Sequence, residues 1–460
     1  MSGRAGRSAA RMAAAGALLA AIACADGADE DRGGAPEDAA PTGVLDLPVD
    51  ARLAARLASF SPLPPVPPDP TNRVADDPSA ALLGQALFFD ERLSANGRVS
   101  CATCHDPDRG FTDGRELAFG LAEGRRKTPT LWNAAHHRWL TWDGRADSLW
   151  MQALDPIEDP TEMGATRTDV ARIVRDDEDL RALYEASLGA LPEALPEGLV
   201  TARPARPGEA ADAPLPAAYA SYTEAERAAI DEVYVGAGKA LAAYQRRLVR
   251  GDAPFDRFVA ALETRDPEGL GALGGPELRG LEIFFGKGSC TLCHSGPNFS
   301  DSEFHNNALP ALDRGEPDDA GRYDGAAVVA ASPFNAAGPF SDAPDGNAAR
   351  AVRTLRQSSE TYGEFRTPSL RNLAGRAPFM HQGQFEDLAA VLEFYSTLEG
   401  QTLRSHHQEQ ILRPVRLERG ELSDLAAFLG SLEGDPLDSR RLAAPTRDEL
   451  RAAASAVRNR

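Results

Sequence analysis

Two pentapeptides of the form Cys-x-x-Cys-His are the residues whose spacing most directly specifies a chemistry. They are Cys101-Ala-Thr-Cys104-His105 and Cys290-Thr-Leu-Cys293-His294. In such a motif both thiols add to the vinyl groups of a haem, and the histidine becomes an axial ligand of the iron. A zinc or redox Cys-x-x-Cys pair is the alternative, but a zinc site needs four local ligands and no redox-fold pattern surrounds either motif. The sequence therefore predicts two covalently attached c-type haems.

The fifth cysteine, Cys24, ends a segment that is typical of an exported protein. Three arginines precede an apolar run over 12–23, which is too short to span a bilayer permanently and predicts a signal peptide over 1–24. The small residues before Cys24 resemble a lipoprotein cleavage box, so we expect a periplasmic protein with a lipid anchor at Cys24. Ordinary cleavage nearby, with Cys24 lost or left as a free thiol, is the alternative. The small, acidic and Pro-rich composition of 25–75 predicts a tether.

The composition limits the partners of the chain. A formal net charge of −20 argues against nucleic acid and against electrostatic adhesion to anionic lipid, and it favours a basic soluble partner. Any contact with a membrane is then expected only through the lipid anchor. A chain of 460 residues with 42% hydrophobic residues can bury more than one core.

Internal repetition predicts two similar halves. The segment 84–113, which contains the first haem motif, recurs as 280–301 around the second, and 128–133 recurs as 367–372. A longer gap, rich in Gly, Pro and Asp, separates His294 from Thr367 and predicts a loop-like insertion. We place the first haem domain at 76–250 and the second at 251–440, followed by a C-terminal tail over 441–460.

The local patterns are helical. Asp77-Pro78 is an N-cap and N1 pair, and Thr223-Glu-Ala-Glu226 is a capping box that opens a long amphipathic helix ending by Gly251. The aperiodic stretch 189–222 and the Gly- and Pro-punctuated stretch 251–276 are interpreted as connections. The predicted fold class is mainly α, with two tandem cytochrome c-type haem domains.

Over roughly 76–435 the chain resembles the bacterial dihaem cytochrome c peroxidases and their MauG-like relatives. The resemblance rests on the haem pentapeptides, on the repeated Thr-Pro elements and on the order of the motifs around them. It implies that the N-terminal haem reacts with hydrogen peroxide and that the C-terminal haem passes or stores electrons. It also implies a protein partner, which is either a soluble donor (a cytochrome c or a cupredoxin) or a protein whose side chain is oxidised.

The run from Trp142 to Met163 is similar to the catalytic stretch of that family. The resemblance makes Glu162 the carboxylate at the open face of the reactive haem, with Gln152 beside it and Trp142 as a relay between the haems. Peroxide heterolysis needs a proton moved between the two oxygens, and a carboxylate with a raised pKa can move it. The alternative for Glu162 is a surface acid after Pro160, and for Trp142 a buried aromatic among neighbouring tryptophans.

Two departures from the family pattern concern the iron ligands. Phe119 stands where many members carry a histidine that blocks the reactive iron, so we expect His105 to be the only protein ligand of the first haem. His136 and His137 could substitute, although a histidine pair in a polar stretch is more often on the surface. At the second haem, the usual methionine position is Tyr395, as in MauG-like proteins.

The expected ligands of the second iron are therefore His294 and Tyr395. An anionic phenolate lowers the potential of the iron and stabilises higher oxidation states, whereas methionine raises the potential. The alternatives are that Tyr395 is a core residue, because it continues the apolar spacing of Leu388, Val391 and Leu392, or that Met380 is the ligand.

Calcium is the cofactor that the resemblance leaves in doubt. Family members often hold calcium between the haems through an asparagine before the Thr-Pro element and through carbonyls near the position of Pro378, but Lys127 occupies the asparagine position here. We hypothesise that the Lys127 ammonium replaces the cation.

Three functions follow from these residues: a donor-fed peroxidase, a MauG-like enzyme that oxidises a partner protein, and a plain electron-transfer cytochrome. Phe119 disfavours the third, and Tyr395 favours the second by analogy.

Overall fold

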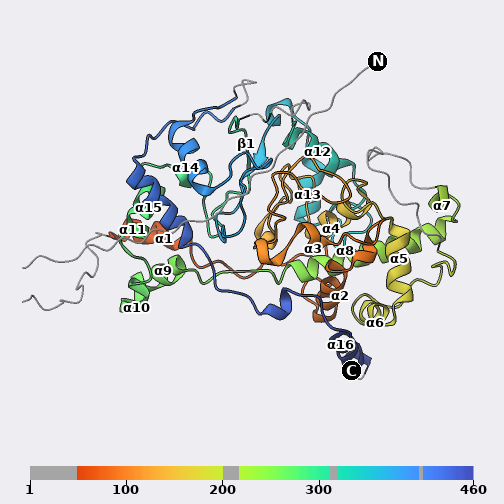
Figure 1. The fold of residues 1–460 in the computed structure, drawn as a ribbon. Coiled ribbons are helices and arrows are strands. Elements are labelled where there is room, and N and C mark those ends of the chain that lie inside the picture. Colours follow the sequence, from red (N-terminus) through yellow and green to blue (C-terminus); the bar gives the residue numbers. More distant parts are fainter. Residues whose placement is uncertain (1–48, 200–216, 311, 313–318, 403–407, 459–460) are drawn as a thin grey trace, which may run out of the picture. The chain divides into compact units, whose positions relative to one another are not determined.

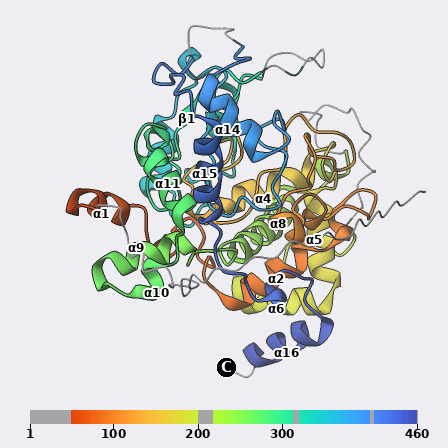
Figure 2. The ribbon, with the colours of Figure 1, turned by 60° about the vertical axis from the view of Figure 1, so that its left-hand side comes forward.

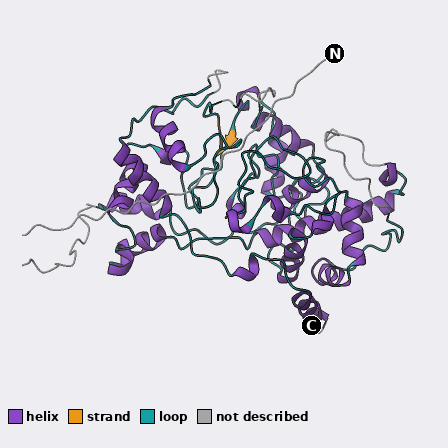
Figure 3. Cartoon of the chain, in the orientation of Figure 1, coloured by secondary structure: helices purple, strands orange, loops and turns teal. Residues whose placement is uncertain are grey.

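The computed structural model describes residues 49–199, 217–310, 312, 319–402 and 408–458. The predicted signal peptide, Cys24 and residues 25–48 lie outside them. The described chain is mainly helical, which confirms the predicted fold class, and its strands β1 (Phe304–His305) and β2 (Phe365–Arg366) form one short antiparallel pair (Figures 1 and 3). No helix within these ranges has the length and apolar character needed to cross a membrane. Residues from Leu47 onward belong to one compact unit.

Helix α8 (Glu224–Gln245) is the centre of the N-terminal half (Figure 2). The predicted capping box of Thr223 and Glu226 opens it, and its residues from Val233 to Gln245 are buried. It packs against α2 (Pro78–Phe88), α4 (Leu149–Glu158) and α5 (Arg167–Asp176). Asp77 caps α2 as predicted, by accepting from the amides of Ser79 and Ala80. A β-carbon at Gly84 would lie 1.9 Å from the Ala240 carbonyl oxygen, so glycine permits the close approach of α2 to α8.

The C-terminal half repeats this packing with a second helix pair. Helix α11 (Gly275–Phe285) lies against α15 (Arg419–Gly430), and a β-carbon at Gly280 would lie 2.0 Å from the Asp424 carbonyl oxygen. Gly84 and Gly280 occupy matching positions in the repeat, so the same close approach is built twice. An aromatic cluster fills the core beside α11, comprising Phe255, Phe284, Phe285, Phe299 and Phe428.

The remaining helices and turns complete the described chain. They are α1 (Ala51–Ala58), α3 (Cys101–Cys104), α6 (Glu178–Leu188), α7 (Ala217–Ala220), α9 (Pro254–Thr264), α10 (Pro267–Leu270), α12 (Arg322–Ala331), α13 (Asn347–Thr354), α14 (Leu388–Thr397) and α16 (Arg447–Arg458). Single 3₁₀ turns lie at Glu91–Leu93, Pro107–Arg109, Ala134–His136, Cys290–Leu292, Ser359–Thr361 and Ser439–Arg441. In the C-terminal tail, α16 contacts α6 and Arg447 pairs with Asp177 at 2.7 Å.

The structure places helices in all three of the predicted irregular segments, including α7 in the stretch 189–222. The stretch 251–276, interpreted as a connection, contains α9 and α10, and the loop-like insertion between His294 and Thr367 contains α12 and α13. Prolines at the first positions of α9 and α10 begin these helices, because the missing amide hydrogen of proline costs nothing there.

The Pro-rich end of the predicted tether is packed against the body. Phe60 is buried against the rings of Phe285 and Phe299, and the Ser61 hydroxyl donates to Asp256 at 2.7 Å. Thr71 and Asn72 are also buried. A spacer can therefore not include residues 60–75, because releasing them would expose apolar surface.

A buried ion pair of the second half holds this segment, because its arginine donates to the Phe60 carbonyl oxygen and its aspartate accepts from Ser61. Arg371 and Asp256 have side chains 0% and 4% exposed and lie 2.7 Å apart. Asp256→Ala leaves a buried guanidinium unpaired, so we expect the free energy of unfolding of the holoprotein to fall by about 3–5 kcal/mol, measured by urea denaturation. Asp424→Ala, which breaks the exposed pair with Arg279, is the control and should have a much smaller effect. Equal losses in both variants would contradict the prediction.

Candidate functional site

The first haem motif forms a short helix whose last residue precedes the histidine. Thr103 closes a capping box with Ser100 at the start of α3, and His105 follows its end. His105 Nδ1 donates to the Phe111 carbonyl oxygen at 3.1 Å, which leaves Nε2 for a metal. Burial lowers the pKa of His105 and so favours the neutral imidazole that ligates iron.

The second motif repeats this arrangement. His294 Nδ1 donates to the Phe299 carbonyl oxygen at 2.9 Å, and burial lowers the pKa of His294. Phe111 and Phe299 both have left-handed backbones, with φ of 57° and 49°. Both histidines are thus oriented by the same local turn, as the predicted duplication requires.

A large cavity lies beside the second motif. It has a volume of about 640 Å³, within the range of cofactor sites, and its lining includes Cys290, Cys293, His294, Met380 and Tyr395. Segments of the first half, including Lys127, Thr128 and Trp142, also line it.

The cavity also contains cations suited to carboxylate groups of a cofactor. Arg366 and Arg376 are 7% and 8% exposed, and within the described ranges neither has a carboxylate at ion-pair distance. Buried guanidinium groups without an anion are costly, and a haem carries two carboxylates that would pair with them. Two thiols, an oriented imidazole and unpaired cations therefore fit a c-type haem at this motif.

Tyr395 faces this cavity from α14, whose buried residues are Leu392, Phe394 and Ser396. The Tyr395 hydroxyl accepts a hydrogen bond from Asn307 Nδ2 at 2.9 Å. Burial raises the pKa of Tyr395, and the Asn307 hydrogen bond opposes that rise. Tyr395 is half-buried and lines the same cavity as His294, whereas a core tyrosine would be enclosed by apolar side chains. Met380 lines the cavity as well, so the geometry keeps both candidate ligands.

Asn307 was not predicted, because no local motif marks it. It follows strand β1, which is anchored by His305. His305 lies between two carboxylates, 2.9 Å from Asp301 and 2.8 Å from Glu409, and the bond to Asp301 is the largest cause that raises the pKa of His305 to about 11. A charged His305 therefore fixes the strand that presents Asn307 to Tyr395.

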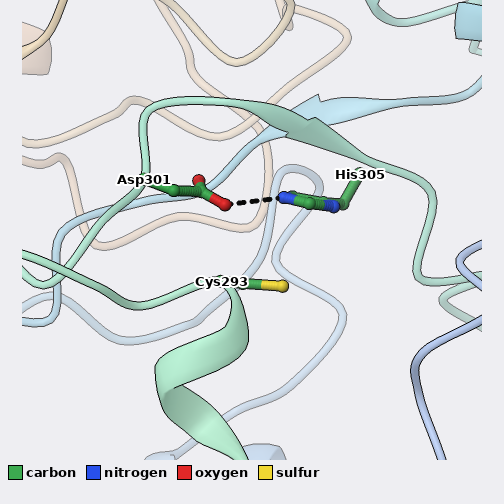
Figure 4. A group of neighbouring side chains, drawn as sticks. All are labelled: Cys293, Asp301 and His305. Carbon is green, nitrogen blue, oxygen red and sulfur yellow. Dashed lines mark hydrogen bonds and ion pairs between the residues drawn. The ribbon is translucent and has the colours of Figure 1, made fainter.

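Cys293, Asp301 and His305 place their ligand atoms within 4.8 Å of one another (Figure 4). Figure 4 shows Asp301 and His305 pointing toward each other above the Cys293 sulfur. A metal ion is not expected here, because both His305 nitrogens bond carboxylates and a Cys293 thioether would lack thiolate charge. The cluster is better explained as an ion-pair clamp.

Glu162 lies in a tight turn that folds back over the end of α4. Its amide donates to the Asp159 carbonyl oxygen, and its own carbonyl oxygen accepts from the Leu121 amide at 3.0 Å. Burial raises the pKa of Glu162 to about 7, with a further contribution from Asp159, while Arg145 acts in the opposite direction. Such a carboxyl group exchanges protons near neutral pH, as a proton carrier must.

The loop that carries Phe119 adjoins both Glu162 and the first haem motif. The Phe119 carbonyl oxygen lies 3.7 Å from Cys104 Sγ, and a β-carbon at Gly120 would meet the Glu162 carbonyl oxygen at 2.3 Å. The structure therefore brings together Glu162, Phe119 and the first motif. Gln152 lies on α4, the helix that precedes the turn of Glu162. In the described structure its side chain forms no hydrogen bond to Glu162.

Trp142 bridges the two halves. Its Nε1 donates to the Lys127 carbonyl oxygen at 2.8 Å, and its ring meets the His381 ring edge-on at 6.4 Å. The Lys127 amide donates in turn to the His381 carbonyl oxygen. Trp142 also lines the cavity beside the second motif, a position that a relay requires.

The neighbouring histidines are not on the open surface. Both nitrogens of His137 lie within 3.1 Å of the Arg366 guanidinium, and burial keeps the pKa of His137 well below its usual value. The surface interpretation of this pair is therefore wrong, and His137 serves the packing between the halves.

Lys127 is buried, with 4% exposure, and its Nζ donates to the Arg115 carbonyl oxygen at 3.3 Å. Burial lowers its pKa to about 8, with Asp113 acting in the opposite direction. An ammonium bonded to a backbone carbonyl between the halves agrees with the hypothesis that Lys127 replaces a cation.

Comparison with known proteins identifies the family of the chain. Residues 78–264 match the profile of the di-haem cytochrome c peroxidases. The chain is 33% identical to the methylamine utilization protein MauG of Methylorubrum extorquens, over 84% of this chain and 86% of the relative. It is 30% identical to a cytochrome-c peroxidase of Denitromonas iodatirespirans, over 79% of this chain and 83% of the relative.

A solved MauG-like protein associated with microbial copper homeostasis has a similar fold. Its TM-score is 0.56 at 27% identity, over 83% of this chain and 98% of that chain. The two haem motifs, the duplicated helix pairs and these similarities lead to one conclusion. The chain belongs to the dihaem cytochrome c peroxidase and MauG-like family of peroxidase oxidoreductases.

Proposed function

We propose that this chain is an exported MauG-like peroxidase, which reduces hydrogen peroxide at the haem of His105 and uses the oxidising equivalents on a protein. The observation that carries the proposal is the difference between the two sites. Glu162 and the Phe119 loop adjoin the first motif, whereas Tyr395 faces the cavity of the second. One site is then suited to peroxide and the other to holding an oxidising equivalent.

The residues have distinct roles in this proposal. When bound, the haems at Cys101, Cys104 and His105 and at Cys290, Cys293 and His294 supply iron that accepts oxidising equivalents and transfers electrons. Glu162 moves a proton from one oxygen of peroxide to the other, so that the second oxygen leaves as water, and Gln152 assists in orienting the peroxide. Trp142 relays an electron between the halves, and Tyr395 would hold the second iron together with His294.

The test is to add stoichiometric hydrogen peroxide to the diferric protein and to record its absorption spectrum. A stable species two equivalents more oxidised supports the proposal. Immediate return to the diferric spectrum, with rapid oxidation of an added reduced cytochrome c, favours a donor-fed peroxidase. That function is the second candidate, because a relative named as a cytochrome-c peroxidase is 30% identical. If the spectrum does not change, both enzymatic functions are contradicted, and the remaining candidate function is that of an electron-transfer cytochrome.

The periplasmic location and the lipid at Cys24 are part of the same proposal. They rest on the predicted signal peptide over 1–24 and the cleavage box before Cys24. Cell fractionation with intact-mass analysis tests them, because a lipidated Cys24 adds the mass of its acyl chains at a new N-terminus.

The pKa of Glu162 predicts a pH dependence. The proton acceptor is the carboxylate, which dominates above a pKa of about 7, so the rate constant for peroxide should rise with pH through that value and then level off. Stopped-flow measurements between pH 5 and 9 test this, and the rise should be absent in Glu162→Gln. The same rise in the variant would assign it to another group.

Lys127 predicts the metal content. If its ammonium replaces the inter-haem cation, elemental analysis of purified protein should find two irons per chain and far less than one calcium, even after dialysis against calcium. Lys127→Asn should then gain tightly held calcium. Stoichiometric calcium in the unaltered protein would contradict the hypothesis.

A further inference from the structure

The four tryptophans of the sequence lie between residues 132 and 150, and three of them have a cation over the ring. Arg250 lies 5.0 Å from the ring centre of Trp132, and Lys239 lies 5.6 Å from that of Trp150. Trp139 has two guanidinium groups, those of Arg322 at 4.3 Å and Arg138 at 5.4 Å. In the part of the chain that the structure describes, Trp142 has none.

Arg322 differs from Lys239 and Arg250 because its charge is not paired, and it differs from Arg138 because it is buried. Lys239 and Arg250 form ion pairs at 2.7 Å with Asp342 and Glu433. Arg322, in contrast, donates to the Gly144 carbonyl oxygen at 2.7 Å, and among the described residues no carboxylate lies within ion-pair distance of it. It is 5% exposed and lies between the rings of Trp139 and Phe304.

A cation at this position raises the free energy needed to remove an electron from the indole ring of Trp139. Oxidation leaves a positive charge on the ring, which is repelled by a guanidinium against its face, and the repulsion is strongest where water is excluded. Trp142 has the opposite environment, because its N–H points at a carbonyl oxygen and that hydrogen bond strengthens when the ring becomes positive. Two tryptophans three residues apart thus differ in how readily they are oxidised.

We propose that Arg322 protects Trp139 from oxidation, so that an oxidising equivalent that reaches this region is confined to Trp142. Arg322 is a positioning residue, since it acts through Trp139 and does not touch peroxide. The proposal rests on the proposed peroxidase function. Without the protection, Trp139 gives two electrons to peroxide and gains a hydroxyl group in place of a ring hydrogen. The balance is one tryptophan and one hydrogen peroxide giving one hydroxytryptophan and one water.

The test treats the diferric holoprotein with ten equivalents of hydrogen peroxide without a donor and quantifies hydroxylated tryptophan by tandem mass spectrometry. Trypsin releases residues 139–145 as one peptide, and fragmentation separates Trp139 from Trp142. Arg322→Met should raise hydroxylation of Trp139 by about tenfold or more, whereas Arg322→Lys should stay near the unaltered protein. Unchanged hydroxylation in Arg322→Met, or equal rises in both variants, would overturn the proposal.

A second variant keeps the test valid if Arg322→Met does not fold. Arg138 is exposed and its guanidinium is farther from the ring, so Arg138→Met should fold and raise Trp139 hydroxylation by about twofold. This variant loses the tryptic site after residue 138, so Trp139 is measured in the peptide 128–145. No rise there would also count against protection by charge. The relay role of Trp142 is measured separately, as loss of the two-equivalent spectrum in Trp142→Phe. An unchanged spectrum in that variant contradicts the relay but leaves the Trp139 result standing.

Discussion

Replacing Glu162 by glutamine should slow the reaction of the diferric protein with hydrogen peroxide by about 10²–10⁴-fold. Glutamine has nearly the same size but cannot take a proton from one peroxide oxygen and give it to the other. The backbone of Glu162 would still hold the Phe119 loop, since that contact involves its carbonyl oxygen. Both haems should therefore remain attached with unchanged diferric spectra. The measurement is the second-order rate constant for peroxide by stopped-flow absorption above pH 7.

Asp155→Asn is the matched control for this prediction. Asp155 is half-exposed and its charge contributes to raising the pKa of Glu162. Removing that charge should move the pH profile to lower pH and leave the maximal rate nearly unchanged, because the proton carrier itself is kept. A large loss of maximal rate in Asp155→Asn, or none in Glu162→Gln, would contradict the assignment of Glu162.

The helix boundaries that carried side-chain signals could be predicted from the sequence. Asp77 and Thr223 cap their helices as expected, because capping depends only on residues within one turn. The segment 251–276 shows where such signals compete. Its Gly and Pro residues predict a connection, but Asp266-Pro267 is the same N-cap and N1 pair as Asp77-Pro78 and begins α10. Proline ends a helix only when it falls inside one.

The candidate site likewise contains some residues that the sequence can suggest and others that only the tertiary structure reveals. The haem motifs could be predicted from their own spacing, and Glu162 and Tyr395 are proposed from their positions in motifs that resemble those of the family. Asn307 beside Tyr395 and Arg322 above Trp139 could not be predicted, since their partners lie far along the chain and only the tertiary fold brings them together. The same holds for the buried Arg366 and Arg376. Only the structure shows that no carboxylate among the described residues lies at ion-pair distance from them.

Replacing Tyr395 by methionine should raise the midpoint potential of the second haem by on the order of 100 mV or more. A phenolate stabilises oxidised iron through its negative charge, whereas a thioether is neutral and favours the reduced state. The stable two-equivalent species should then be lost, while the first reaction with peroxide continues. Spectroelectrochemical titration of the variant and the unaltered protein measures the potential.

Met380→Leu and Asn307→Leu separate this assignment from its alternatives. Met380 lines the same cavity, so if it were the ligand, Met380→Leu would shift the potential and Tyr395→Met would not. With Tyr395 as the ligand, Met380→Leu should change little. Asn307→Leu should change the potential in the direction opposite to Tyr395→Met, because it removes a hydrogen bond that withdraws charge from the phenolate oxygen and so makes that oxygen a stronger donor to the iron. An unchanged potential in Asn307→Leu would contradict ligation by Tyr395.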